Sequence, residues 1–225
     1  MHFFRIAIVA AIFTAGAIDT CLAQSGYGST FAGDVAIPLG SFSNSFKTGY
    51  GAHVDFYMQN EDYLRFSLLL GYTRWSIDND KVNQQYASMG GTGTYQLDGG
   101  ISTFPVLVGV TLLSPPAGFR FYGLVEVGVY LYSGKLNGQK TENGVVTQNI
   151  YESLSKSVGG ANLGAGILML MNKDLSLDIC GRYHFVKTNT YYNYDLYGNP
   201  SAVSTNRYFT IALGVTWSYP PVESK

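Results

Sequence analysis

Apolar and polar residues alternate with a period of two along the last regular segment of the chain, residues 208–219. The odd-numbered positions from Phe209 to Tyr219 are all apolar or aromatic, whereas the even-numbered positions from Tyr208 to Ser218 are mostly small or polar. Side chains of a β-strand point alternately to opposite faces, so this segment predicts a strand with one apolar face and one polar face.

The same alternation recurs along the chain, interrupted in turn by short and long connections. Three short turns are expected at residues 58–62, 114–118 and 171–174, and four long polar loops at 40–48, 76–100, 132–157 and 187–206. Three turns and four loops separate eight strands. The expected strands are residues 30–38, 49–57, 63–75, 101–113, 119–131, 159–170, 175–185 and 208–219.

The charges near the centres of these strands all fall on one face. The opposite face carries residues such as Leu68, Val127 and Ile179. A cationic side chain facing lipid near the bilayer midplane costs about 2 to 4 kcal/mol, so a barrel in lipid needs this segregation. The polar face predicts an interior network made of Asp34, His53, Asp55, Arg65, Arg120, Glu126, Asp178, Arg182 and His184.

We therefore predict an all-β fold, an eight-stranded antiparallel up-and-down transmembrane β-barrel with short periplasmic turns and long extracellular loops. Eight strands enclose a bore that side chains can fill, so the interior is expected to be a packed polar network. A soluble barrel of the lipocalin type has an apolar calyx and a polar exterior, which is the reverse of this pattern. Glycines on the inward face of the sixth strand, including Gly160, Gly164 and Gly166, should leave room for larger side chains opposite.

The first 23 residues have the composition of a cleaved signal peptide. Arg5 precedes an apolar run from Ile6 to Ala17, which is too short for a spanning helix, and in Cys21-Leu22-Ala23 small residues occupy the positions that a signal peptidase requires. The predicted domains are a signal peptide at 1–23 and one barrel domain at 24–225. No later run approaches about 18 consecutive apolar residues. The net charge of -1 argues against nucleic acid as a partner.

Three parts of the chain resemble the small bacterial outer-membrane β-barrel family that includes OmpA-type, OmpX-type and OmpW-type proteins. They are residues 36–42 with 48–51, residues 164–166 with 175–178, and the C-terminal pattern of Gly214, Trp217 and Tyr219. The resemblance implies location in the bacterial outer membrane with periplasmic termini and extracellular loops. It also implies two partners, outer-membrane lipids and the barrel-assembly machinery that recognises the C-terminal signal, and it carries no activity with it.

No catalytic, cofactor or metal site is predicted. His184 with Asp178, or His53 with Asp55, could be drawn into a lipid A-modifying enzyme, but both histidines face inward and the His-x-Ser pattern of a lipid A deacylase is absent after His184. Two histidines on strands that are not neighbours lack the ligand spacing of a metal site. A narrow or solute-specific channel, gated by partner exchange among the inward charges, remains the alternative function.

The final long loop is rich in tyrosine and asparagine, which suits adaptable contacts. It could bind an unknown extracellular ligand, or it could pack over the mouth of the barrel, and the sequence leaves both hypotheses open. The main prediction is a non-enzymatic protein with a structural or surface-interaction role through its extracellular loops. The candidate contact residues are Tyr191, Tyr192, Tyr194 and Tyr197.

Overall fold

Eight antiparallel strands form a closed ring in which each strand pairs with the next and β8 pairs with β1. The computed structural model describes residues 26–60, 62–188 and 204–219. The predicted fold class, an eight-stranded antiparallel barrel, is confirmed. The strands are β1 (Gly26–Leu39), β2 (Gly49–Asn60), β3 (Leu64–Ser76), β4 (Thr94–Leu113), β5 (Phe119–Glu142), β6 (Val145–Leu170), β7 (Leu175–Thr188) and β8 (Ser204–Tyr219).

The two faces of the strands divide as the alternation predicts. On β5, Phe121 and Val127 point outward with 61% and 51% of their surface exposed, while Glu126 between them is 1% exposed. The outward positions of β8 are likewise large and apolar, and its inward Thr210 and Thr216 are buried. Exposed apolar side chains of this kind form a continuous belt around the barrel, which we call the apolar belt.

The three short turns lie at one end of the barrel, together with the first residue of β1 and the last residue of β8. They connect β2 to β3, β4 to β5 and β6 to β7, at the positions expected from the sequence. At the turn before β7, the Asn172 side chain accepts hydrogen bonds from the backbone N–H groups of Asp174 and Leu175. This side-chain bonding explains the tight reversal.

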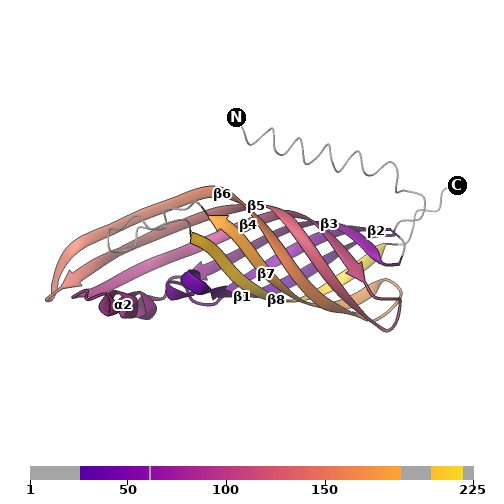
Figure 1. Cartoon of the computed structure of the whole chain (residues 1–225), viewed down its shortest axis with the longest axis horizontal. Coiled ribbons are helices and arrows are strands. Elements are labelled where there is room, and N and C mark those ends of the chain that lie inside the picture. The colour runs from indigo at the N-terminus through magenta and orange to yellow at the C-terminus, as the bar shows by residue number, and fades with distance from the viewer. Residues whose placement is uncertain (1–25, 61, 189–203, 220–225) are drawn as a thin grey trace, which may run out of the picture.

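The prediction of a long loop at residues 132–157 is wrong, because β5 and β6 continue through this segment as a paired hairpin. Their pairing runs from the barrel to Glu142 and Val145, with one irregularity between Lys140 and Thr141. Asn143 and Gly144 join the strands with φ values of 50° and 77°, the left-handed conformation that an Asn-Gly hairpin turn requires. Figure 1 shows these strands extending well past the rest of the barrel.

The loop expected at residues 76–100 is also partly wrong, because it contains a helix and the first residues of a strand. Helix α2 (Asn79–Ser88) begins after Asp78, whose side chain accepts a hydrogen bond from the Lys81 backbone. Strand β4 starts at Thr94 and pairs with β5 up to Thr141. We call residues 94–100, 132–142 and 145–158 the extension.

Two asparagines attach α2 to the edge of β4. The Asn79 side chain donates to the carbonyl of Leu97 at 2.8 Å and accepts from its N–H at 2.9 Å. Asn83 repeats both bonds with Tyr95, at 3.0 and 2.6 Å. Residues four apart on a helix face the same side, so the two amides satisfy the strand edge as a neighbouring strand would.

The first long connection contains a short 3-10 helix, η1 (Gly40–Asn44). The candidate tyrosines of the last loop and the predicted signal peptide lie outside the residues that the structure describes. Within the described part of the chain, no helix is both long and apolar enough to cross a membrane.

Candidate functional site

A chain of hydrogen bonds and one ion pair crosses the bore of the barrel and joins six of its strands. It begins at Asp34 on β1 and passes through His53 on β2 to Arg182 on β7. Arg182 Nε lies 3.4 Å from Glu126 Oε2 on β5, in an ion pair whose two side chains are nearly inaccessible to solvent. The structure thus brings together four residues of the predicted interior network, and we call the whole chain the transverse network.

The contact with Arg182 fixes the donor and acceptor roles of the two His53 ring nitrogens. The Nε2 atom of His53 lies 3.2 Å from Arg182 Nη1, and a guanidinium has only donors, so Nε2 must accept. The proton therefore resides on Nδ1, which donates to the Asp34 carboxylate at 3.0 Å. The imidazole thereby bridges the Arg182 guanidinium and the Asp34 carboxylate.

The other arm of the network leads from Glu126 to His184. Asn162 on β6 donates to Glu126 Oε2 at 2.9 Å, and Tyr130 donates its hydroxyl proton to Asn162. The Tyr130 oxygen lies 3.1 Å from His184 Nδ1, and His184 Nε2 lies 3.0 Å from the Thr210 hydroxyl on β8. Both ring nitrogens of His184 are engaged, which leaves no free nitrogen for catalysis.

Asn162, Tyr130 and Thr210 were not predicted as members of the network. They are neutral, and the sequence reasoning selected charged residues only. Their inward positions in the period-two pattern were the available signal, because a buried polar side chain needs a hydrogen-bond partner.

Two tyrosines of β5 depend on glycines of β6. A Cβ atom added to Gly160 would lie 2.6 Å from the ring of Tyr130, and one added to Gly166 would clash with the hydroxyl of Tyr122. The expectation that inward glycines leave room for larger side chains is therefore confirmed at these positions. Tyr122 uses the space to donate to Asp178 at 2.6 Å.

The remaining network residues line a small polar cavity nearer the turns. Its walls include Asp55, Arg65, Asp178 and Arg182, and its volume is about 20 Å³. A space of this size holds about one water molecule. Arg65 donates to Gln59 at 2.8 Å and lies over the ring of Tyr57, while Asp55 Oδ1 is buried without a protein partner.

Arg120, another predicted network residue, bonds to backbone carbonyls instead of to an interior carboxylate. Its Nε donates to the backbone carbonyl of Ser114 at 3.1 Å, and its Nη2 to the carbonyls of Ser114 and Asp62. Arg120 is the second residue of β5, so its side chain lies at the end of the bore. There it ties two of the short turns together.

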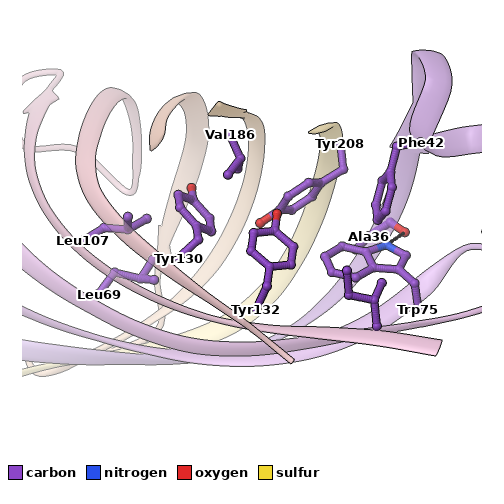
Figure 2. Packing of buried hydrophobic residues seen from close by; sticks show 10 residues of the cluster. Ala36, Phe42, Leu69, Trp75, Leu107, Tyr130, Tyr132, Val186 and Tyr208 are labelled. Atoms are coloured by element: carbon purple, nitrogen blue, oxygen red, sulfur yellow. Dashed lines mark hydrogen bonds between the residues drawn. The ribbon is translucent and has the colours of Figure 1, made fainter. Parts of the chain in front are cut away.

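An apolar cluster fills the bore on the loop side of the network, as Figure 2 shows. Trp75 is fully buried and donates its indole N–H to the carbonyl of Ala36 at 3.2 Å. Its ring meets Tyr208 edge-on at 4.9 Å and Phe42 at 5.2 Å. Phe42 comes from η1, so the first long connection folds over the mouth. Members of the cluster include Ala36, Phe42, Leu69, Trp75, Ile101, Leu107, Tyr130, Tyr132, Val186 and Tyr208.

Outside the barrel, the side of the extension that continues the bore surface packs against α2. Val82 and Tyr86 of the helix form a buried cluster with Tyr95 and Leu97 of β4 and Ile150 of β6. This small core gives the extension its own packing, separate from the bore.

Lys140 fixes the far end of this small core. Its Nζ lies 2.6 Å from Glu142 Oε1 and 5.0 Å from the centre of the Tyr86 ring. The hydrogen bond to Glu142 raises the pKa of Lys140, and the same bond lowers the pKa of Glu142.

In the residues for which the structure gives positions, no three His, Cys, Asp or Glu side chains lie close enough to hold a metal ion. Cys180 is buried in the bore wall with an apolar cluster around it. The arrangement inside the barrel can stabilise a closed ring.

Comparison with known proteins supports the fold. No protein-family model matches the sequence, and no curated protein matches it significantly. Among solved structures, Neisserial surface protein A is similar with a TM-score of 0.53 at 14% identity, over 87% of this chain and 99% of that chain.

Two further similar structures have lower scores. Ail, the attachment invasion locus protein of Yersinia pestis, matches with a TM-score of 0.47 at 15% identity, over 87% of this chain and 97% of that one. The N-terminal β-barrel domain of Pseudomonas aeruginosa OprF gives 0.43 at 12% identity, over 87% and 100%. The chain thus shares its fold with a small outer-membrane barrel at very low sequence identity.

Proposed function

We propose that this chain is an integral outer-membrane β-barrel that serves as a non-conducting anchor for an interaction surface outside the cell. The observation that carries the proposal is the contrast between a filled bore and an ordered, helix-supported extension of β4, β5 and β6. The extension provides a surface for contacts beyond the barrel. The filled bore leaves no path for a solute.

The apolar belt supports the membrane location. On β5 the belt runs from Phe119 to Leu131, and strands rise about 3.3 Å per residue at a tilt of roughly 40°. The belt is then about 30 Å tall along the barrel axis, close to the ~25 Å apolar band of outer-membrane barrels. Above it, the outward residue Ser133 begins a polar surface.

The extension supports the interaction role because it is rigid. Its edge on β4 is covered by Asn79 and Asn83, and its inner side packs on α2. Binding by a rigid sheet loses less conformational entropy than binding by a flexible loop. We also propose Tyr191, Tyr192, Tyr194 and Tyr197 as candidate contacts, on the strength of the sequence alone.

For assembly, we propose that Gly214, Trp217 and Tyr219 at the end of β8 form the signal read by the barrel-assembly machinery. Trp217 and Tyr219 point outward, and their rings are stacked 6.4 Å apart. Gly214 faces inward, where an added Cβ would lie 2.6 Å from that of Ala32. The assembly role and the close packing of β8 on β1 thus use different faces of one strand.

The two tryptophans of the chain allow a direct test of the membrane location. Trp217 is 55% exposed on the outward face, and Trp75 is buried in the bore. In vesicles of brominated lipid, the Trp75→Phe variant, which keeps Trp217, should be strongly quenched, and the Trp217→Phe variant should not. Equal quenching of both, or a chain that stays soluble without lipid, would refute the membrane role.

Conductance separates the anchor from the channel. The refolded chain in planar bilayers should show no steady openings, because the transverse network and the apolar cluster around Trp75 fill the bore. Steady single-channel currents in the wild type would overturn the anchor and favour the narrow pore.

A further inference from the structure

The outward face of the extension carries mainly uncharged side chains that can form hydrogen bonds. Strand register places Gln96, Gln139 and Asn149 in one row across the three strands, and Asp98, Asn137 and Tyr151 in the next. Residues paired across strands point to the same side of a sheet. All six are exposed, and Tyr151 is 78% exposed. The two rows hold four amides, the carboxylate of Asp98 and one aromatic ring.

Charge is largely missing from this face, although it abounds on the other. Lys140, Glu142 and Glu152 belong to the side that faces α2, whereas the outward side of the described extension has only Asp98 and Lys135 as charged residues. An exposed strand face in water commonly carries charges that keep sheets from associating. Most positions on the outward side of the extension instead carry uncharged hydrogen-bonding groups.

The position of the outward face relative to the apolar belt limits which partners it can contact. Outward positions on β5 change from Val127 and Leu131 to Ser133 and Asn137 without any break in the strand. If the belt lies in lipid, as we propose above, the first layer beyond it on this side is the headgroup layer of the outer leaflet. In the outer membrane that layer consists of the sugars of a glycolipid.

We propose that the outward face of the extension binds the oligosaccharide of the outer-leaflet glycolipid. This inference rests on the proposed membrane location. Amide side chains both donate and accept hydrogen bonds, as sugar hydroxyls do, so rows of Asn and Gln complement a saccharide. The exposed ring of Tyr151 offers a flat apolar surface for the C–H face of a sugar ring.

A protein partner fits this face less well. Stable protein interfaces centre on several large apolar or aromatic anchors that become fully buried. The outward rows provide Tyr151 alone, surrounded by amides. Neutral polar groups also give little electrostatic steering toward a charged partner.

Backbone amide shifts of the wild type in phospholipid nanodiscs provide the test, with the deacylated oligosaccharide of a bacterial lipopolysaccharide as the titrant. Saturable shifts should appear at Asn137, Asn149 and Tyr151. Replacing Tyr151 by Ser should weaken binding about fivefold, the loss of one aromatic contact of roughly 1 kcal/mol.

Two adjacent amides give a matched control. Asn149→Ala removes a side chain from the outward face, and Gln148→Ala removes one from the opposite face of the same strand, where Gln148 is also exposed. Only Asn149→Ala should weaken the titration. Equal effects of the two substitutions, or no shifts on the outward face, would overturn the proposal.

Two further arms identify the source of any response. Nanodiscs that contain lipid A without sugars should leave the outward face unshifted, and a response there would assign the contact to phosphate or acyl groups and sink the sugar proposal. Shifts that depend on protein concentration instead would indicate contact between copies and would overturn the sugar proposal as well. Failure of the membrane role would show separately, as absence of Trp217 quenching by brominated lipid.

Discussion

The barrel and its extension share β4, β5 and β6, but the two regions place apolar and polar side chains on opposite faces. On β5 the bore side holds Glu126 and the outer side Val127, whereas beyond Leu131 the bore side holds Leu136 and the outer side Asn137. The alternation keeps its period and reverses its sense within a few residues. The surroundings of each segment, lipid or water, therefore decide which face of a strand is apolar.

The largest expected effect concerns the charge inside the bore. Glu126→Gln leaves Arg182 buried without its anionic partner, which should lower the free energy of unfolding by about 3 to 5 kcal/mol. Urea titration of the protein folded in vesicles measures the loss. Glu152→Gln is the control. Glu152 lies in the extension, on the face that continues the bore side of the barrel, but it is partly exposed, so this substitution should leave the unfolding midpoint unchanged. If Glu126→Gln were as stable as the control variant, the bore would be filled with water.

The second prediction compares two outward positions on one strand. Val127→Arg puts a charge in the apolar belt and should destabilise the folded barrel by about 2 to 4 kcal/mol in lipid. Asn137→Arg introduces the same side chain ten residues further along the outward face and should be neutral. Unfolding of both variants in vesicles measures the difference. Equal stability of the two would show that the boundary of the apolar belt does not lie between residues 127 and 137.

The third prediction addresses the edge of the extension. Asn83→Ala removes the two hydrogen bonds to Tyr95 and should make opening of α2 easier by about 1 to 3 kcal/mol. Hydrogen exchange at Tyr95 and Leu97 should accelerate, while amides of the barrel strands keep their protection. Gln84→Ala, a neighbouring position on α2, serves as the control. Faster exchange throughout the barrel would show that the two regions unfold as one unit.

The smallest expected effect is a pH dependence confined to the extension. The hydrogen bond between Lys140 and Glu142 lowers the pKa of Glu142. The contact therefore adds stability above the pKa of the unfolded glutamate, and this stability is lost as the pH falls through the lowered pKa of the folded state. Side-chain signals of Tyr86, followed by NMR between neutral and acid pH, should report a local change. Glu142→Gln should abolish the transition, and a transition that survives this substitution would have another origin.

The barrel could be predicted from sequence because lipid imposes a strict alternation. Between Phe119 and Leu131 a charge on the wrong face is too costly to tolerate, so each position reveals its side. In the extension most apolar residues lie on the face toward α2, and residues such as Leu136 and Ile150 stand among amides and hydroxyls. Such a segment has the composition of a loop, and only the Asn143-Gly144 pair indicated a hairpin.

The interior network was predicted in part. Charged side chains such as Glu126 and Arg182 could be assigned inward from their register alone. Which of them touch could not, since contacts across the bore depend on the tilt and stagger of all eight strands. Arg120 shows the limit: its face was predicted, but its place at the end of the bore, where turn carbonyls are nearer than carboxylates, required the structure.

The transverse network also bears on the order of folding events. It starts on β1 at Asp34 and ends on β8 at Thr210, and these two strands join only when the ring closes. A curled but open sheet would leave Arg182 or Glu126 without its full set of partners inside lipid. Partly closed intermediates are thereby raised in energy relative to both the unfolded chain and the complete ring. Closure becomes an all-or-none step, and an incomplete barrel has little tendency to persist in the membrane.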